Sequence, residues 1–265
     1  MTADPQLPQR QVNQTFACIA SSVLVLLGGV ALAGWIFHVE VLKQIIPGAL
    51  PMKPNMAAGF LLCGITLAIV SRKMASKPMR ICAMAISASV GVVSAMTLGE
   101  HIFGWDFPIE EWLITGPVPE VVDTLHPGRV LFVTALGFLL CASALFAASM
   151  SVSKPFRFRI VVGLGASLLF IGVVPLVGFL FEIIFGPRWN FMGMDISSVP
   201  PAIGFTLLGC GLLALLQSKA RLTWSLNRLT TAGFVIGLAL MVTAAAAAFS
   251  FTKSLARELA SRTTF

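Results

Sequence analysis

The chain has 265 residues, of which 57% are apolar and only 11% are charged. Soluble domains carry about 25% charged residues, so the composition excludes an ordinary soluble domain and indicates an all-α integral membrane protein. The net charge of +7 comes from basic residues in short groups between apolar segments. That pattern orients a chain in a bilayer rather than binding nucleic acid, so the lipid bilayer is a predicted partner and nucleic acid is not.

Seven segments are long and apolar enough to cross a bilayer as helices. They lie near residues 15–37, 52–71, 80–98, 129–150, 159–186, 200–217 and 230–251. The loops 72–80, 151–159 and 218–228 together hold ten Lys or Arg and no acid. Because positive residues stay on the cytoplasmic side, these loops and the tail 1–14 are predicted to be cytoplasmic.

An internal repeat organises the first six segments. "MAAGFLLCGITLAI" begins at Met56, "VTALGFLLCASALF" at Val133 and "PAIGFTLLGCGLLAL" at Pro201. The alignment superimposes three glycines, each followed by Phe: Gly59, Gly137 and Gly204. Small residues let membrane helices approach closely, so these glycines are expected to pack against neighbouring helices. The repeat predicts a six-helix domain, 15–217, of three helical hairpins (15–71, 80–150 and 159–217), followed by one extra span.

The odd-numbered segments share a motif at their outer ends, "GWIFH", "EHIFG" and "EIIFG", which aligns Phe37, Phe103 and Phe185. The alignment places Glu100 and Glu182 at one repeat position. A carboxylate near a helix C-terminus is unfavourable by about 0.3–1 kcal/mol, so both acids need partners. The candidate residues at this outer face are Glu100, Glu182, Lys53, Arg129, Arg188, Asn55 and His101. They predict either ion pairs that tie hairpin to hairpin or a polar pocket that reads a ligand, an ion or pH.

Catalytic and cofactor motifs do not occur in the sequence, so no catalytic residue, metal or cofactor is predicted. The five cysteines lie inside apolar runs and are interpreted as small core residues. Two weaker alternatives are a haem between His38 and His101 and a hard cation in the acidic loop 104–128. Interfacial histidines and an ordinary solvated loop are the simpler interpretation.

Three stretches resemble the N-terminal membrane-embedded sensor regions of bacterial signalling proteins. They are "LPMKPNMAAGFLLCGITL" (50–67), "LGEHIFGWDFPIEEWL" (98–113) and "HPGR" (126–129) ahead of "TALGFLL". Such regions precede PAS, histidine kinase or diguanylate cyclase modules, and the resemblance covers residues 20–216. It implies a sensory or anchoring domain in the bacterial inner membrane, with any enzyme activity in the parent protein. The second hairpin lacks the family's Met-x-Pro-Asn start, so only Asn55 matches that motif.

The tail 230–265 resembles the leading helix of a helical extracytoplasmic sensor module. This resemblance implies a seventh span that continues outside the membrane, a homodimer formed through that span, an unidentified extracytoplasmic ligand and a chain cut short of its output module. A transporter or channel subunit is the main alternative function, and a membrane redox or assembly factor is a weaker one.

Overall fold

The computed structural model describes residues 7–43, 51–72, 75–103, 132–150, 155–185 and 199–219. Within these ranges all the regular secondary structure is helical, as predicted from the sequence. The helices are α1 (Leu7–Ile36), α2 (Glu40–Lys43), α3 (Pro54–Ser71), α4 (Lys77–Phe103), α6 (Phe132–Ser149), α7 (Pro155–Phe185) and α8 (Val199–Lys219). Six of them are long and apolar enough to cross a membrane. The predicted seventh span, 230–251, lies outside the described residues.

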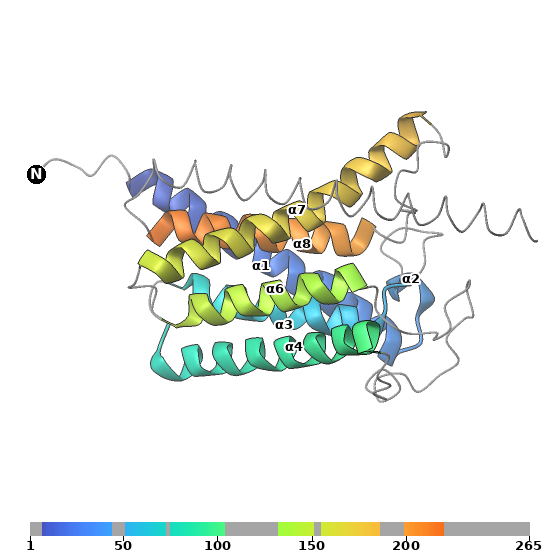
Figure 1. Cartoon of the computed structure of the whole chain (residues 1–265), viewed down its shortest axis with the longest axis horizontal. Helices are drawn as coiled ribbons and strands as arrows, with labels where there is room; N and C mark the ends of the chain where they lie inside the picture. The colour runs from blue at the N-terminus through green and yellow to red at the C-terminus, as the bar shows by residue number, and fades with distance from the viewer. Residues whose placement is uncertain are drawn as a thin grey trace, which may run out of the picture.

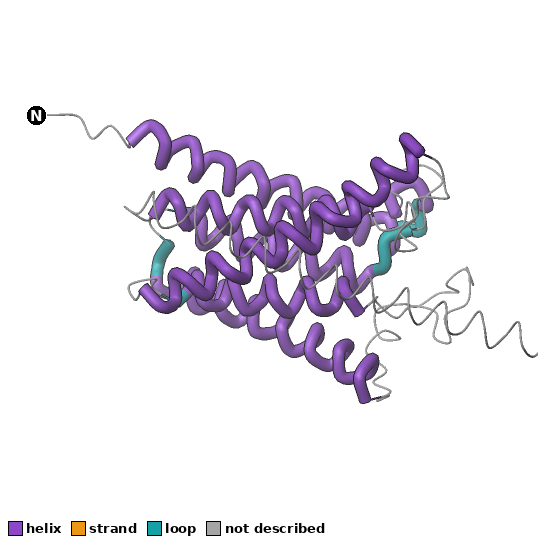
Figure 2. Tube along the Cα trace, turned by 45° about the horizontal axis from the view of Figure 1, so that its top comes forward, coloured by secondary structure: helices purple, strands orange, loops and turns teal. Residues whose placement is uncertain are grey.

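The six long helices run side by side as three antiparallel hairpins (Figures 1 and 2). Helices α1 and α3, α4 and α6, and α7 and α8 form the most extensive helix pairs. We call the end where α1, α4 and α7 finish the outer end, after the predicted orientation. The short helix α2 lies there (Figure 1).

In each hairpin one helix lies at the centre of the bundle and the other at its periphery, and we call them the inner and the outer helix. In the membrane-spanning parts of α3, α6 and α8, 56–67% of residues are buried, against 33–39% in α1, α4 and α7. Each outer helix also packs against the inner helix of the preceding hairpin, so that α1 contacts α8, α4 contacts α3 and α7 contacts α6. The three hairpins are therefore arranged in a closed circle, with their inner helices at the centre.

The centre of this circle is filled by three phenylalanines and three glycines, which we call the Phe–Gly cluster: Phe60, Phe138, Phe205, Gly59, Gly137 and Gly204. The ring centroids of the phenylalanines lie 4.8, 5.1 and 5.2 Å apart, in tilted arrangements that aromatic pairs prefer. Each aromatic ring also packs against the position that a Cβ would take on the glycine of the preceding inner helix.

The order of these contacts is cyclic. A Cβ on Gly59 would lie 2.7 Å from the ring of Phe138, and one on Gly137 would lie 2.6 Å from the ring of Phe205. Gly204 completes the circle against Phe60. Each glycine thus faces the phenylalanine of the following hairpin, and the last faces the first.

Glycines also bring outer and inner helices into backbone contact. A Cβ on Gly28 of α1 would lie 2.5 Å from the carbonyl oxygen of Ala57, and Gly172 of α7 faces the corresponding carbonyl of Ala202. These two contacts define equivalent positions in the first and third hairpins. Counting from Gly172 by the number of residues that separates Phe37 from Gly28 reaches Phe181. By this packing register, Phe185 lies one helical turn beyond the position that the sequence alignment gave it.

Equivalent positions in α1 and α4 are separated by a constant number of residues. The buried pairs are Ala17 with Ala83, Ser21 with Ser87, Leu24 with Val90 and Ala31 with Thr97. This separation agrees with the alignment of Phe37 and Phe103. Applied with the register of α7, it makes Gly178 rather than Glu182 the counterpart of Glu100.

Side chains from α1 and α4 cap the last turns of α3 and α6. These turns lie at the end of the bundle opposite the outer end, which we call the inner end. Gln14 of α1 donates to the carbonyl oxygen of Ser71 at 2.9 Å. Arg80 of α4, at the equivalent position, donates twice to the carbonyl oxygen of Ser149, at 3.0 and 2.8 Å. Carbonyls in a last helical turn have no partner within their helix, so these contacts satisfy groups that would otherwise be unpaired.

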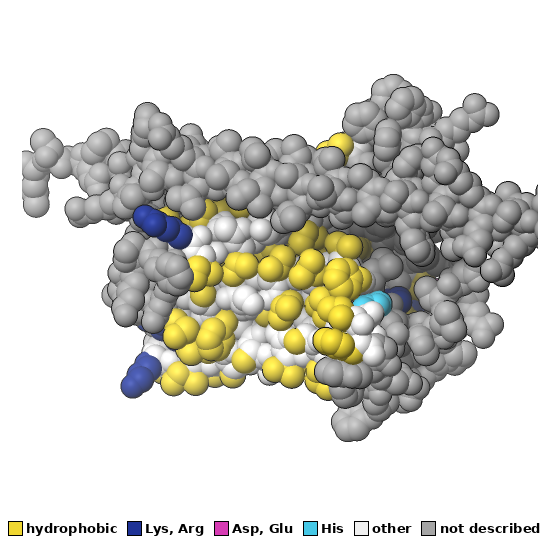
Figure 3. Space-filling view, viewed as in Figure 1, with side chains coloured by type: hydrophobic (Ala, Val, Ile, Leu, Met, Phe, Trp, Pro, Cys, Tyr) yellow, Lys and Arg dark blue, Asp and Glu magenta, His cyan; other side chains and the backbone are white. Residues whose placement is uncertain are grey.

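The outward faces suit a lipid environment. Helix α1 exposes a row of large apolar side chains, Phe16, Ile19, Val23, Leu26 and Val30. In the face seen in Figure 3, hydrophobic side chains lie along the flank of the bundle, and Lys and Arg side chains lie near its ends, at the inner end and beside a His at the outer end. This distribution supports a multi-pass membrane protein.

Candidate functional site

The outer end of the first hairpin is built around a sharp turn after α1. His38 has a φ of 55°, and the N–H of Val39 donates to the carbonyl oxygen of Gly34 at 2.9 Å. A left-handed residue with this hydrogen bond is the Schellman type of helix ending, which usually has Gly at the left-handed position. The turn folds α2 back onto α1.

Close packing of α2 depends on Gly34. A Cβ on Gly34 would lie 2.8 Å from the backbone nitrogen of Lys43 and 2.9 Å from the Cβ of Leu42. The N–H of Met52, just before α3, donates to the carbonyl oxygen of Lys43 at 2.9 Å. Helix α2 is thus fixed to both helices of its hairpin.

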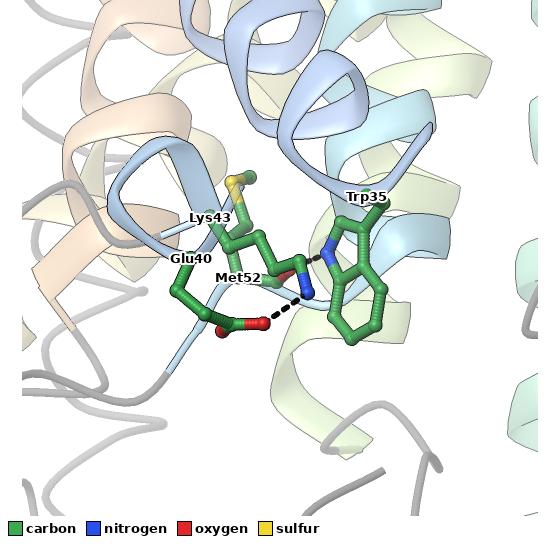
Figure 4. Close-up of polar contacts among 4 residues, drawn as sticks. All are labelled: Trp35, Glu40, Lys43 and Met52. Atoms are coloured by element: carbon green, nitrogen blue, oxygen red, sulfur yellow. Dashed lines mark hydrogen bonds and ion pairs between the residues drawn. The ribbon is translucent and has the colours of Figure 1, made fainter. Parts of the chain in front are cut away.

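Lys43 is the most deeply buried cation among the described residues, with 7% of its side chain exposed. Its Nζ lies 2.6 Å from Oε1 of Glu40 and 4.4 Å from the centroid of the Trp35 ring. The indole N–H of Trp35 donates to the carbonyl oxygen of Met52 at 2.8 Å, which holds the ring in place beside the ammonium (Figure 4). A cation beside an aromatic face is stabilised by about 0.5–2 kcal/mol.

The outer end of the second hairpin carries an acid at the equivalent place. Glu100 is 3% exposed, and its counterpart in α1 is Gly34, against which α2 packs. His101 corresponds to Trp35, and its ring meets the ring of Phe132 edge-on at 6.1 Å. One hairpin therefore presents a buried base and the other a buried acid at the same level of the bundle.

The other predicted site residues are placed as follows. Lys53 is the N-cap residue of α3 in an extended conformation. Asn55 follows in the first turn of α3, where its side-chain oxygen accepts a hydrogen bond from the N–H of Met56 at 2.9 Å. Glu182 belongs to the outer end of α7, of which only the backbone is described. Arg129 and Arg188 lie outside the described residues, so the pairing of Glu100 with Arg129 stays a prediction.

The two weaker alternatives gain no support from these positions. Among the described residues, no group of three or more His, Cys, Asp or Glu side chains could hold a metal ion. His38 is part of the turn after α1, whereas His101 faces Phe132. The acidic loop 104–128 lies outside the described residues.

Comparisons with protein-family models, curated proteins and solved structures gave no match for this chain. The case for a function therefore comes from the residues themselves.

Sequence reasoning missed Lys43 and the role of Trp35. The available signal was local, because Lys43 follows Glu40 by three residues, the spacing of an intrahelical ion pair.

The ion pair of Lys43 with Glu40 can be replaced by another at small cost, since the Glu40 side chain is 66% exposed and an exposed partner adds little to an ion pair. An anionic group arriving from outside could replace Glu40 at the Lys43 ammonium without desolvating a buried acid.

Proposed function

We propose that this chain is the membrane-embedded sensory or anchoring domain of a bacterial signal-transduction receptor. It passes a membrane or periplasmic signal to a cytoplasmic output module such as a histidine kinase or a diguanylate cyclase. The observation that carries the proposal is the Phe–Gly cluster, which fills the axis of the bundle and links all three hairpins.

An interlocked core suits signal transfer. Close-packed interiors have low compressibility and transmit strain. A displacement of one hairpin therefore displaces the next, because the glycine of the first packs against the phenylalanine of the second. The buried Lys43 and Glu100 stand at the outer ends of two hairpins. A ligand that changed the partners of either residue would act on a hairpin that is mechanically coupled to the other two.

A transporter or channel subunit is the second candidate, and a membrane redox or assembly factor is the third. A conduction path along the bundle axis is disfavoured, because the aromatic rings of Phe60, Phe138 and Phe205 are in mutual contact there. Flux of ions and small solutes into proteoliposomes tests the second candidate. Protein-dependent flux that survives a Lys43→Met change but stops when the Phe–Gly cluster is overpacked would favour transport over sensing.

The proposal includes seven spans, a cytoplasmic N-terminus in the bacterial inner membrane, a homodimer formed through the seventh span and an extracytoplasmic ligand. Reporter fusions test the orientation. Fusions after residues 76 and 155 are expected to be cytoplasmic, and fusions after residues 48 and 118 extracytoplasmic. A cytoplasmic result at residue 118 would contradict the hairpin topology on which the outer site depends.

The class of function is tested by the genomic sequence that lies downstream of the Phe265 codon. A PAS, kinase or cyclase module there is the expected result. Replacing Lys43 by Met and Glu100 by Gln in that full-length protein should then alter output activity while membrane insertion is preserved. A stop codon beside transporter genes would favour the second candidate instead.

A further inference from the structure

The lipid-facing side of α1 reaches the outer end of the bundle. Its row of large apolar side chains begins with Phe16, and Phe37, directly after α1, continues that row at helical spacing and is 72% exposed. At a rise of about 1.5 Å per residue, the helix from Phe16 to Ile36 is about 30 Å long, which is the thickness of a hydrocarbon core. When this face of α1 is in lipid, Phe37 therefore lies where acyl chains meet headgroups.

Helix α2 brings Lys43 back to this level. The turn at His38 reverses the chain, and the backbone nitrogen of Lys43 packs onto Gly34, within one helical turn of Phe37. The neighbouring apolar side chains are exposed: Ile36, Val39, Val41 and Leu42. Tryptophan is enriched at this depth of a membrane, and the ring of Trp35 lies beside the ammonium. The charge of Lys43 is thus held at the depth of lipid phosphates.

The present partner of this ammonium can be exchanged. Nζ of Lys43 lies between the carboxylate of Glu40 and the ring of Trp35 (Figure 4). The Glu40 side chain is mostly exposed and can turn into water, whereas the Trp35 ring is fixed by its hydrogen bond to Met52. A phosphate oxygen in the place of Oε1 would accept a charge-assisted hydrogen bond, which is among the strongest in proteins. The buried charge would then remain paired.

We propose that Lys43 and Trp35 form a binding site for the phosphate of a phospholipid, whose acyl chains lie along the exposed face of α1 from Phe37 toward Val30. The two parts of such a lipid meet two adjoining features, since the chains meet the apolar row and the phosphate meets the buried ammonium. A soluble anion would meet only the second feature. The site would exist whether or not the protein is a receptor.

The test is native mass spectrometry of the full chain, released from detergent micelles after titration with phosphatidylglycerol. Two parts of the same lipid are the matched probes: diacylglycerol, which lacks the phosphate, and glycerol phosphate, which lacks the chains. Phosphatidylglycerol should bind about tenfold more tightly than either, because only the whole lipid combines apolar contact with a hydrogen bond to a charged group.

Variants locate the binding. Lys43→Met keeps an unbranched apolar stem and removes the charge, so it should lower the affinity for phosphatidylglycerol about tenfold and leave that for diacylglycerol unchanged. Glu40→Gln removes the competing carboxylate, so it should raise the affinity for phosphatidylglycerol about two- to fivefold. Because Glu40 is exposed, this second variant gives a result even if Lys43→Met does not fold. Lys77→Met, at an exposed lysine that begins α4, is the matched control and should leave the tightest binding unchanged.

Three kinds of result would overturn the proposal. Equal affinities for phosphatidylglycerol and diacylglycerol would mean that the protein recognises the chains alone. Displacement of phosphatidylglycerol by an equal concentration of glycerol phosphate would mean that the site binds a soluble anion. Unchanged binding to Lys43→Met, or weaker binding to Glu40→Gln, would mean that the lipid is held elsewhere.

Discussion

Replacing Gly137 by Ala is a direct test of the Phe–Gly cluster. The new Cβ would lie 2.6 Å from Cζ of Phe205 and 2.8 and 2.9 Å from its two Cε atoms. Ordinary contact begins at 3.4 Å, so the aromatic ring would have to retreat by most of an ångström. The rings of Phe138 and Phe60 lie 5.1 and 5.2 Å from it and block that movement. Overpacking of this kind costs about 1–3 kcal/mol.

The measurement is thermal unfolding of the purified protein in detergent. Gly163→Ala is the matched control, because nothing lies within 4 Å of the Cβ position at Gly163; the change there should cause no loss of stability. A double-mutant cycle adds specificity. Phe205→Leu removes the ring that Gly137 faces, so it should reduce the loss caused by Gly137→Ala. It should reduce the loss caused by Gly59→Ala less, because Gly59 faces Phe138 and Phe205 only packs against that ring. Equal losses at Gly137 and Gly163, or equal rescue of Gly59→Ala and Gly137→Ala by Phe205→Leu, would refute the cyclic arrangement.

Three further changes test the ends of the bundle. His38→Gly should stabilise the protein by about 0.5–1 kcal/mol, because Gly adopts a positive φ without the steric cost of a side chain; unchanged melting would mean that the turn carries no strain. Arg80→Ala should lower stability by about 1 kcal/mol through loss of two hydrogen bonds to Ser149, and Arg80→Gln should lower it less, since a glutamine does the same work in the first hairpin. Glu100→Gln and Arg129→Gln should each lower the melting temperature, and the double change should lower it by less than the sum of the two single losses. Strictly additive losses would mean that the two residues are not partners.

Much of the architecture was predictable because a membrane imposes length and composition on a span. The helix observed at Pro54–Ser71 differs by two residues from the prediction, and Pro54 is its first residue. Helix α1 begins eight residues before its predicted start, since its polar first turns carry no hydropathy signal although they continue the helix. The hairpin pairing followed from the repeat, and it explains why Gly59, Gly137 and Gly204 all contact aromatic rings.

Other features depended on three-dimensional packing. The motif "EIIFG" matched "EHIFG" in letters, but the backbone contact at Gly172 sets α7 one turn further out. Sequence also could not show that Phe60 would pack against Gly204, because repeated positions become neighbours only when their helices are adjacent in the bundle. Lys43 escaped notice because its burial results from α2 folding onto Gly34, which no apolar periodicity encodes.

The cyclic order of the Phe–Gly cluster also constrains biosynthesis. Phe138 meets Gly59, and Phe205 meets Gly137, in hairpins made one after the other. Phe60 is different, because its glycine, Gly204, belongs to the third hairpin, which is synthesised after the first two. The first hairpin must therefore wait in the lipid with an unmatched aromatic ring until the third arrives. The Phe–Gly cluster can be completed only after all three hairpins have been synthesised.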